Sequence, residues 1–351
     1  MPIKIQENIS LSKYTSFKIG GPARYFCVVK DIDEIKEALE FTGKKKLKVF
    51  VLGGGSNLLI ADKGFDGLVI RIQNSKFKIQ NSNIICGSGL SLAKLVFELA
   101  EADLTDIEWA AGIPGTVGGA IANNAGAFGK CMEDVVKEVE VLEINRWLHS
   151  PDRAVEPIAQ KGSTSTHLLP SSSQGGQARG ELSQWNQRMF TNKQCQFSYR
   201  NSIFKKEKKY IILDAVLKLE KGDQEKNKKT IAEILESRRE KQPLEHPSAG
   251  SVFKNPVVDG AHLEKLKKEF PELNEIVKNN TISAGWMIEQ IEGLKGKKIG
   301  GAMVSEKHCN FIVNVENAKA EDVIILISLI KQKIRSHFGI QLKEEIEYIG
   351  F

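Results

Sequence analysis

The chain has 351 residues, with 50 Lys and Arg against 44 Asp and Glu, and 41% of its residues are hydrophobic. These proportions are those of an ordinary globular protein, and they exclude collagen, coiled coil and wholesale disorder. The formal net charge of +6 is mild and diffuse, so it fits an acidic small-molecule partner and gives no support for nucleic-acid binding. At roughly 150 residues per domain, the length predicts two or three domains.

The cysteines and the N-terminal residues indicate the cellular compartment. Five scattered cysteines without a CxxC pair argue against a disulfide framework or a zinc site and favour free thiols in a reducing compartment. The N-terminal residues have no apolar signal core, and no stretch approaches the ~18 apolar residues of a membrane span. We therefore expect a cytoplasmic protein without a bound metal or a membrane anchor.

The first predicted elements form a small α+β unit. Asp31 and Glu34 make a capping box in front of a helix, which Gly43 is placed to end. The apolar runs 48–52 and 67–72 predict two buried strands on either side of a glycine-rich loop.

Three further elements are predicted downstream. Residues 84–86 predict a strand, and Ser91 is the expected cap of a helix whose apolar residues recur at helical spacing. The segment 110–129 consists almost throughout of small residues. A later helix is expected over about 320–338, with Gly339 as its stop.

One long segment does not fit this pattern. From about 146 to 190 the sequence is rich in Ser, Gln, Gly and Pro and lacks a usable period, which is typical of a loop or a disordered region. A structureless run of this length is uncommon inside a compact domain, so we interpret it as an insertion. Residues 141–145 before it and 191–195 after it are expected to join as strand, turn and strand.

Two glycine-rich segments are candidates for holding a phosphorylated ligand. Glycines in the 53–57 loop let backbone N–H groups approach phosphate oxygens, and Ser56 and Asn57 can add side-chain donors. Five glycines within 112–126 are costly in conformational entropy unless a pyrophosphate or a flat ring system comes close to the backbone. A tight turn and tight helix packing are the structural alternatives. Neither a P-loop nor a complete GxGxxG motif is present.

Three polar segments remain. Residues 197–202 place an Arg beside an aromatic residue, and residues 247–256 place a Ser after Ala-Gly with an Asn four residues on. Residues 342–350 alternate carboxylates with apolar residues like an edge strand. Without further information, a surface loop, a turn and a solvated strand face are the simpler explanations of these segments. A Ser-His-Asp hydrolase is not supported, because there is no GxSxG elbow.

Taken together, the motifs become recognisable. They occur in the order 14–23 (YTSFKIGGPA), 53–57 (GGGSN), 112–119 (GIPGTVGG), 198–202 (SYRNS), 249–256 (AGSVFKNP), 284–290 (AGWMIEQ), 307–311 (KHCNF) and 345–346 (EI). This pattern resembles the UDP-N-acetylenolpyruvoylglucosamine reductase (MurB) family of flavoenzymes, over essentially the whole chain except about 146–190. The direct run from 218–220 to 242–244 resembles the shorter, second type of that family.

The resemblance implies an α+β fold with a two-lobed FAD-binding domain of the PCMH or vanillyl-alcohol-oxidase type. The lobes would span about 1–72 and 73–220, followed by a C-terminal α+β substrate-binding domain over 221–351 whose last strand returns near the flavin. By motif match, the residues implied to hold FAD are Gly53, Gly54, Gly55, Ser56, Asn57, Gly112, Ile113, Pro114, Gly115, Thr116, Gly118, Gly119, Asn123 and Ala125.

The resemblance also implies a reaction, that of a UDP-N-acetylmuramate dehydrogenase. NADPH would pass a hydride through FAD to the enolpyruvyl group of UDP-N-acetyl-enolpyruvoylglucosamine, giving UDP-N-acetylmuramate for peptidoglycan. The implied catalytic residues are Arg200, Ser251 and Glu345, and the implied substrate contacts are Tyr199, Asn255 and Gln290. Arg200 would stabilise negative charge on the enolate. Glu345 would orient the reacting group or share a proton with it, and Ser251 would protonate the substrate carbon.

Two alternatives stay open from the sequence. A related FAD oxidase or dehydrogenase acting on an alcohol would need a different C-terminal domain. A non-catalytic UDP-sugar- or flavin-binding protein is disfavoured by the intact catalytic motifs but left open by the insertion. We expect the reductase, acting as a cytoplasmic monomer with a UDP-sugar and NADPH as partners, in cell-wall synthesis and hence in cell shape and division.

Overall fold

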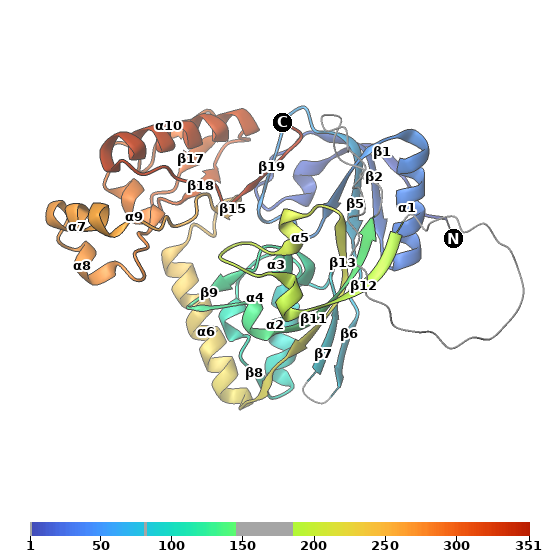
Figure 1. Cartoon of the computed structure of the whole chain (residues 1–351). Coiled ribbons are helices and arrows are strands. Elements are labelled where there is room, and N and C mark those ends of the chain that lie inside the picture. The colour runs from blue at the N-terminus through green and yellow to red at the C-terminus, as the bar shows by residue number, and fades with distance from the viewer. Residues whose placement is uncertain (1, 81–82, 145–184) are drawn as a thin grey trace, which may run out of the picture.

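The computed structural model of the chain describes residues 2–80, 83–144 and 185–351. Three larger sheets follow one another along these residues, and Figure 1 shows the third to the left of the other two. No helix in the described ranges is long and apolar enough to cross a membrane.

The first sheet has the strand order β1 (Gln6–Ser10), β2 (Pro22–Val29), β5 (Phe65–Ile72) and β3 (Lys48–Leu52). β1 is antiparallel to β2, whereas β2 and β3 both run parallel to β5. The strands predicted from the two apolar runs are confirmed as β3 and β5. Because the crossover from β2 toward the parallel strand β5 needs a long connection, α1 (Ile32–Lys45) lies between them in sequence and packs on this sheet (Figure 1).

The start of α1 is as predicted, but its end is not. The Asp31 carboxylate accepts a hydrogen bond from the Glu34 N–H at 2.9 Å. The helix continues past Gly43 to Lys45, and Lys46 adopts the left-handed conformation that ends it, with φ of 53°. Thr42, one residue before the glycine, is completely buried. Packing of the last turn therefore outweighs the cost of about 1 kcal/mol that a glycine imposes on a helix.

The second sheet is antiparallel throughout, in the order β12 (Trp185–Thr191), β11 (Val136–Ile144), β13 (Tyr210–Lys218), β7 (Asn83–Gly87) and β6 (Phe77–Gln80). The strand and helix predicted around residues 84–100 are confirmed as β7 and α2 (Leu92–Glu101). The Ser91 hydroxyl caps α2 by accepting a hydrogen bond from the Lys94 N–H.

The hairpin of β11 and β12 corrects the boundaries expected for the insertion. Residues 145–184 lie outside the described residues, so the expectation for them is untested. The last six residues of the supposed insertion, 185–190, belong to β12, and Trp185 pairs with Ile144. Residues 192–195 form a 3-10 helix rather than the expected strand. Phe190 explains the difference, because its buried ring packs against Phe204 and Tyr210 and anchors the strand on which it lies.

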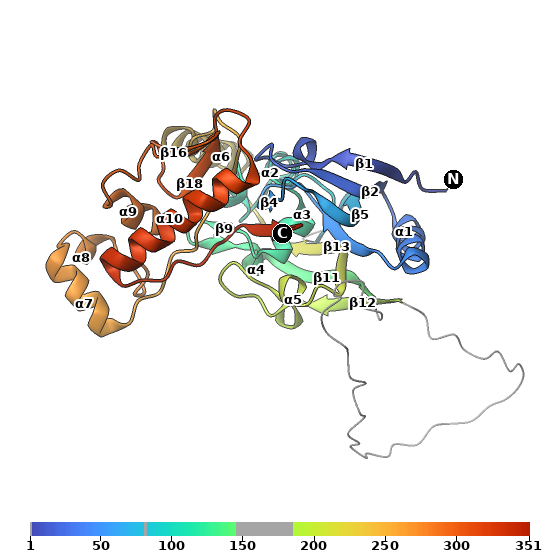
Figure 2. The ribbon, with the colours of Figure 1, turned by 90° about the horizontal axis from the view of Figure 1, so that it is seen from above.

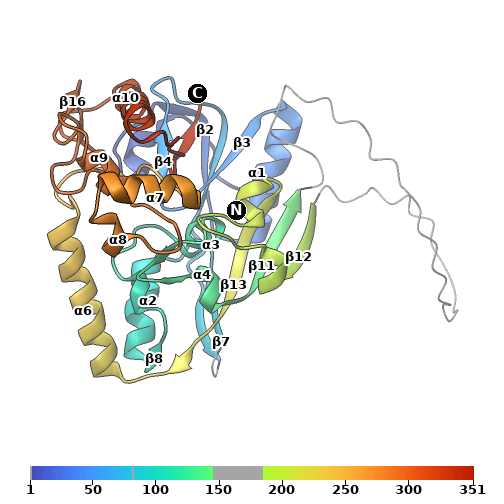
Figure 3. The ribbon, with the colours of Figure 1, turned by 60° about the vertical axis from the view of Figure 1, so that its left-hand side comes forward.

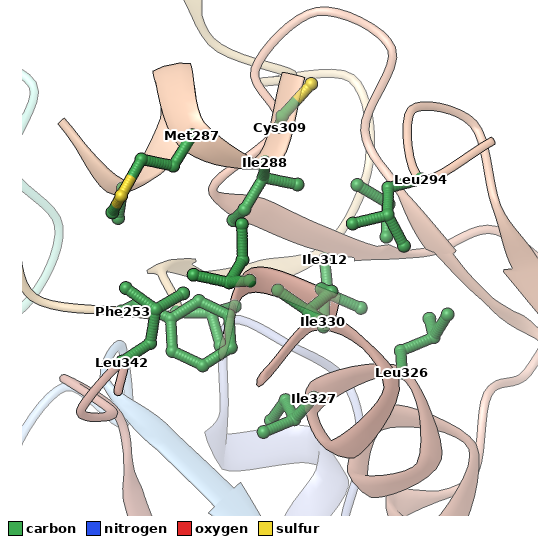
Figure 4. Close-up of a cluster of buried hydrophobic side chains, with 14 of the residues drawn as sticks. Phe253, Met287, Ile288, Leu294, Cys309, Ile312, Leu326, Ile327, Ile330 and Leu342 are labelled. Carbon is green, nitrogen blue, oxygen red and sulfur yellow. The ribbon is translucent and has the colours of Figure 1, made fainter. Parts of the chain in front are cut away.

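The third sheet is antiparallel, in the order β15 (Ser248–Ser251), β18 (Phe311–Asn314), β17 (Ala302–Val304) and β16 (Lys298–Ile299). Its helices are α7 (Gly260–Glu269), α8 (Leu273–Ile276), α9 (Ala284–Glu289) and α10 (Ala320–Phe338). The prediction of α10 is confirmed, including its end at Gly339, where φ is 67°. Figure 4 shows side chains of α9, β18 and α10 converging in one core, among them Met287, Ile312 and Ile330.

The remaining elements are η1 (Leu11–Tyr14), β4 (Leu58–Ile60), β8 (Leu104–Thr105), η2 (Glu108–Ala110), α3 (Val117–Ala122), β9 (Gly126–Ala127), β10 (Lys130–Cys131), α4 (Met132–Val135), η3 (Asn192–Cys195), α5 (Ile203–Lys206), β14 (Glu220–Lys221), α6 (Gln224–Lys241) and β19 (Glu347–Ile349). All are short except α6, which runs alongside α2 and leads into the third sheet (Figure 3).

Two links tie the C-terminal residues to the N-terminal ones. β19 pairs in parallel with β4, with Glu347 opposite Leu58, and Figure 2 shows the red C-terminal strand beside β4. Phe17, Ile19 and Leu59 pack into the hydrophobic core of the third sheet. Of the segment 342–350, which was expected to be an edge strand, only Glu347–Ile349 is a strand, and it lies next to the glycine-rich loop that precedes β4.

The cysteines are all free. Burial raises the pKa of three of them, Cys27, Cys86 and Cys195, to about 12. Thiols with so high a pKa are poor nucleophiles, so these three act as small apolar core residues.

Candidate active site

A cleft of about 1150 Å³ is lined by residues of all three sheets, for example Val51 in β3, Ile212 in β13 and Ser248 in β15. All fourteen residues predicted to hold FAD line this cleft. The three predicted catalytic residues, Arg200, Ser251 and Glu345, line it as well. The fold therefore brings these two predicted sets together.

The two glycine-rich loops of the cleft are in close contact with each other. A Cβ on Gly54 would stand 2.5 Å from the Cα of Gly115, so neither loop has room for a side chain there. Gly55 has a φ of +64°, and a Cβ on it would stand 2.0 Å from the Tyr14 carbonyl oxygen. Close approach and a left-handed backbone explain these glycines, and the contact presents both loops to the same side of the cleft.

The side-chain donors of the 53–57 loop form hydrogen bonds with other parts of the protein. The Ser56 hydroxyl donates to the Pro114 carbonyl at 3.0 Å, and the Asn57 amide donates to the Asn123 side chain and the Glu345 carbonyl. Among the described residues, the N–H groups of Gly54, Gly55, Ser56, Gly115 and Thr116 in these loops donate no backbone hydrogen bond. Free N–H groups on facing glycine loops are the donors that a diphosphate needs, so the donor set fits FAD.

Buried polar atoms without a hydrogen-bond partner give a second test of whether the cleft fits FAD. Among the described residues, the buried side-chain N and O atoms without a hydrogen-bond partner are Ser88 Oγ, Arg200 Nε and Arg238 Nε. All three residues line the cleft. Buried polar groups are normally hydrogen-bonded, and leaving one unpaired costs roughly 1–3 kcal/mol. Their gathering in one cleft indicates that a ligand with oxygen or nitrogen acceptors completes it.

Arg200 lies in a tight turn. Ser198 and Asn201 exchange two backbone hydrogen bonds of 3.0 Å across it, and Arg200 has a φ of +54°, which is uncommon for a residue with a side chain. The Asn124 amide holds the turn by donating to the Ser198 carbonyl at 3.1 Å. The strained backbone is fixed by these contacts, so the guanidinium has a defined place in the cleft.

Backbone pairing brings Ser251 and Glu345 together. Ser251 ends β15, and the next residue, Val252, accepts a 2.7 Å hydrogen bond from the Glu345 N–H. On its other side, Glu345 is held through its carbonyl by the Asn57 amide at 3.1 Å. Hydrogen bonds therefore hold the backbone of Glu345 between the third sheet and the 53–57 loop.

Arg200 and Glu345 form an ion pair in the cleft. Nε of Arg200 lies 2.6 Å from Oε1 of Glu345, although its N–H is not aligned to donate a hydrogen bond to it. Both side chains are largely buried, with 25% and 18% of their surfaces exposed. The pair is therefore electrostatic, and the guanidinium keeps donor capacity for a ligand.

Two residues beyond Glu345, a second carboxylate is held by lysines. Glu347 lies 3.0 Å from the Lys208 ammonium and 3.5 Å from that of Lys205, which also donates to the Asn123 side chain at 2.6 Å. Burial alone would raise the pKa of Glu347, but the two lysines outweigh it and lower that pKa. Burial lowers the pKa of Lys205 despite its carboxylate partner. The cluster anchors β19 to the cleft wall.

The residues predicted to contact substrate stand apart from the cleft lining. Tyr199 is half exposed, and its hydroxyl accepts a 3.4 Å hydrogen bond from the Asn255 N–H. The Asn255 side chain accepts from the Ala284 N–H at the start of α9, and Gln290 follows the end of that helix. Tyr199 and Asn255 are in contact, whereas Gln290 is connected to them only through α9.

Sequence reasoning missed several cleft residues. Ser88, Lys205, Arg238 and Glu347 were not predicted, although all of them line the cleft. Ser88 directly follows β7 and lies between two glycines, and this arrangement is the one available signal. The others occupy charge-rich runs in which nothing distinguishes a cleft residue from a solvated one.

Two protein-family models match the sequence of this chain. The family model described as the C-terminal domain of UDP-N-acetylenolpyruvoylglucosamine reductase matches residues 242–349, and a model described as an FAD binding domain matches residues 23–145. Two curated relatives bear the name UDP-N-acetylenolpyruvoylglucosamine reductase. The protein from Caldanaerobacter subterraneus is 36% identical, over 99% of this chain and 94% of that protein. The protein from Alkaliphilus oremlandii is 37% identical, over 97% of this chain and 91% of that protein.

A solved structure resembles the fold as a whole. The reductase from Thermus caldophilus matches with a TM-score of 0.69 and 29% identity, over 99% of each chain. The match includes all three sheets, so the likeness is not limited to the part that would bind a flavin.

Proposed function

The chain belongs to the UDP-N-acetylenolpyruvoylglucosamine reductase family, and from this we infer that the cleft is where it binds FAD and its substrates. It is an FAD-dependent oxidoreductase with the α+β fold of the PCMH-type flavoproteins. It uses NADPH to reduce UDP-N-acetyl-enolpyruvoylglucosamine to UDP-N-acetylmuramate, a step in peptidoglycan precursor synthesis. The C-terminal match disfavours the alcohol-oxidising alternative.

The cofactor site is proposed from the donor set. When bound, FAD supplies the relay for two electrons and a hydride between NADPH and the sugar nucleotide. The facing loops 53–57 and 112–119 would cradle its diphosphate through their free N–H groups. Asn57 and Asn123 would act by joining these loops to each other rather than as ligands, because their amides are already bonded.

Arg200 is proposed to stabilise charge on the substrate. Reduction of the enolpyruvyl group leaves negative charge on the carbon beside its carboxylate, as an enolate. A guanidinium fixed by a tight turn can meet that charge with two parallel N–H groups, a term often worth several kcal/mol. Arg200 lines the cleft and leaves 25% of its side chain exposed, which supports this role.

Glu345 is proposed to orient Arg200 and the reacting group. Its carboxylate lies 2.6 Å from the Arg200 Nε, and its backbone is bonded on both sides, so it has little freedom to move. A carboxylate held at this distance fixes the direction of the guanidinium fork. It can also share a proton with the substrate.

Ser251 is proposed to donate the proton to the enolate carbon. A serine hydroxyl is a weak acid, but an enolate carbon is basic enough to take its proton if the geometry is held. Gly250, just before it, has a φ of +77°, and a Cβ on it would meet no atom within 4 Å. Both residues line the cleft. Tyr199, Asn255 and Gln290 are proposed to contact the sugar nucleotide beyond the cleft.

The domain boundaries, the cellular compartment and the oligomeric state are also proposals. Residues 1–72 and 73–220 would form the two FAD-binding lobes and 221–351 the substrate-binding domain, and the presence of one larger sheet in each range supports this division. Helix α6, at the start of the last range, packs on α2 and η2 of the second lobe. Free cysteines support a reducing cytoplasm. We propose that the protein acts there as a monomer, and that its product serves cell shape and division.

The observation that carries the catalytic proposal is the convergence of Arg200, Ser251 and Glu345 in the cleft that holds the free N–H groups. Anaerobic stopped-flow tests it directly. The bound flavin should lose its absorbance near ~450 nm on addition of NADPH and recover it on addition of the enolpyruvyl sugar nucleotide. A flavin that NADPH bleaches, but that the sugar nucleotide does not reoxidise, would contradict the proposed substrate.

A further inference from the structure

A buried asparagine holds the backbone that follows Ser251. Asn310 is 4% exposed, and its side-chain oxygen accepts a 3.0 Å hydrogen bond from the Phe253 N–H. Its side-chain amide donates at 2.9 Å to the Phe253 carbonyl, and its own backbone carbonyl accepts from the Val252 N–H at 2.8 Å. The Phe253 ring lies in the core that Figure 4 shows. Asn310 therefore pairs with Val252 and Phe253 as a neighbouring strand would.

The backbone that precedes Ser251 is less constrained. The ladder of β15 and β18 pairs Ser248 with Val313 and Ser251 with Phe311, and its register shifts between these two pairs. Gly250 lies within the shift and has a φ of +77°. A bulge in a ladder changes the direction of a side chain, and a glycine permits many backbone conformations. The direction of the Ser251 side chain therefore depends on the residues that follow it.

Asn310 is itself held by a turn with buried polar contacts. The Ser305 hydroxyl, which is 2% exposed, accepts hydrogen bonds from the N–H groups of Lys307 and His308 at 3.1 and 3.2 Å. Nδ1 of His308 accepts from the Asn310 N–H at 3.2 Å. Burial lowers the pKa of His308 and so favours the neutral ring that can accept this hydrogen bond. The motif at 307–311 thus presents Asn310 in one orientation.

We propose that Asn310 is a positioning residue for Ser251, whose hydroxyl it aims at the substrate carbon by fixing Val252 and Phe253. In the step concerned, the O–H bond of Ser251 breaks, a C–H bond forms on the enolate carbon, and the alkoxide recovers a proton from water. A misplacement of about 1 Å can slow such a step by about 10²-fold. The inference rests on the proposed role of Ser251 and adds a residue that acts through the backbone.

Asn310→Asp tests this in the full chain with bound FAD. A neutral carboxyl keeps both hydrogen bonds to Phe253, because its carbonyl accepts and its O–H donates, whereas an ionised carboxylate has no donor. At about pH 8 we expect NADPH to reduce the flavin at the wild-type rate, and the sugar nucleotide to reoxidise it roughly 10- to 100-fold more slowly. Because burial raises the pKa of a carboxyl, reoxidation should recover toward the wild-type rate as the pH is lowered to about 5.

The wild type over the same pH range is the reference, because the neighbouring titratable groups are present in both chains. These groups are His308, Cys309, Glu289 and Glu345. If Asn310→Asp unfolds at the higher pH, Asn310→Gln gives the same comparison, because it keeps a neutral amide and displaces it by one carbon.

Asn314 is the matched control, because it is a second buried asparagine and ends β18, the strand that begins just after Asn310. Its amide donates to the Phe17 carbonyl at 3.2 Å, and its side-chain oxygen accepts from the Ala318 N–H at 2.8 Å. Neither partner is next to Ser251. Asn314→Asp should lose stability when its carboxyl ionises, but the ratio of its two half-reaction rates should stay that of the wild type.

A double-mutant cycle completes the test. If Asn310 acts through Ser251, Asn310→Asp should slow the reoxidation of Ser251→Ala by less than about twofold. Undiminished slowing in that background, equal slowing of both half-reactions, or wild-type reoxidation of Asn310→Asp at every pH would overturn the inference. A failure of the proposed function gives a different result, in which Ser251→Ala alone is reoxidised at the wild-type rate.

Discussion

Arg200 has a left-handed backbone conformation and forms an ion pair, so the position of its guanidinium is fixed. A substitution there tests whether the shape of this group matters in addition to its charge. Arg200→Lys retains the charge but replaces a planar two-donor group by a point charge. We expect the turnover of this variant to fall roughly 10²- to 10³-fold, as on loss of a fixed donor to a developing oxyanion. The flavin spectrum should be unchanged. Steady-state kinetics with saturating NADPH measure the effect, and turnover near that of the wild type would remove Arg200 from the mechanism.

Ser251 is proposed to act after the flavin has been reduced, so its removal should separate the two half-reactions. We expect Ser251→Ala to bind FAD and to be reduced by NADPH at the wild-type rate. Reoxidation by the sugar nucleotide should be slower by about 10²- to 10⁴-fold. Stopped-flow absorbance follows both steps. Equal slowing of both steps would contradict a role limited to proton donation.

At this scale, sequence reasoning succeeded where a residue lies in a distinctive motif. Arg200, Ser251 and Glu345 come from segments that are far apart in sequence, and the structure places all of them on one cleft. Ser88 and Arg238 could not be found in this way, because what distinguishes them is the lack of a partner. Whether a buried group is unpaired depends on residues from other elements, which a single sequence does not reveal.

The hairpin of β11 and β12 gives a prediction at the scale of elements. Because Ile144 pairs with Trp185, an Asn-Gly turn in place of residues 145–184 suits a two-residue connection. We expect this variant to retain FAD and to unfold at no lower temperature, since a shorter connection reduces the closure entropy by ~0.6 kcal/mol per halving of length.

A matched deletion that also removes residues 185–190 should be destabilised by several kcal/mol. It loses the edge strand and the buried Phe190 ring, and Phe-to-Ala changes alone cost about 3–5 kcal/mol. Thermal denaturation and flavin content compare the two variants. If the shorter deletion also loses flavin, the segment 145–184 contributes to the cofactor site.

Glu347 gives the second prediction for an element, because it ties β19 to Lys205 and Lys208. Its pKa is lowered in the folded state, so the folded protein binds the proton less readily than the unfolded chain. The stabilisation it provides is therefore present above its ordinary pKa of about 4.5 and is lost as pH falls through the folded value. We expect Glu347→Gln to lower the free energy of unfolding by about 1–2 kcal/mol at pH 7.

The difference between this variant and the wild type should disappear on acidification. Urea unfolding at pH 7 and at a series of pH values below 4.5 measures it, because the difference is fully lost only below the folded pKa of Glu347. Glu236→Gln, which removes an exposed partner of Arg239, is the control and should cost no more than ~1 kcal/mol at each pH. A difference that persists unchanged at low pH would show that the charge of Glu347 is not what anchors the strand.

Sequence reasoning at this scale was strongest where local signals agreed. A cap, an apolar period and a terminal glycine together predicted α10 with its end at Gly339. Gly43 was misjudged because its neighbour Thr42 is buried against the sheet, and propensity is easily overridden by packing. β12 was missed because five of its seven residues are exposed, and its middle residues 186–189 are polar or flexible and lack the β-branched and aromatic side chains typical of a strand.

At the scale of the whole molecule, the cleft depends on all three sheets at once. A ligand that binds only the folded form stabilises it by about 2.7 kcal/mol at a hundredfold excess over its dissociation constant. Because FAD would touch residues from each sheet, we expect it to raise the melting temperature of the entire chain, by several degrees. Differential scanning calorimetry with and without FAD checks this. A separate transition for the C-terminal part that ignores FAD would contradict it.

The resemblance predicts the overall architecture, but not the strand with which the last strand pairs. No local property of residues 58–60 or 347–349 indicates that they pair with each other, and their pairing is parallel. The expectation that the last strand returns toward the flavin came from the family pattern. Geometry then added the detail, with Glu345 held between Val252 and Asn57.

The pairing of β4 with β19 has a consequence for the kinetics of folding. The Asn57 amide and the Glu345 carbonyl that it binds are 288 residues apart in sequence. Contacts of such separation form slowly, because the entropy of closing the loop must be paid before they contribute. Each sheet can assemble from nearer neighbours, so this contact is expected among the last to form. During refolding, the capacity to retain flavin should therefore return later than the secondary structure of the individual sheets.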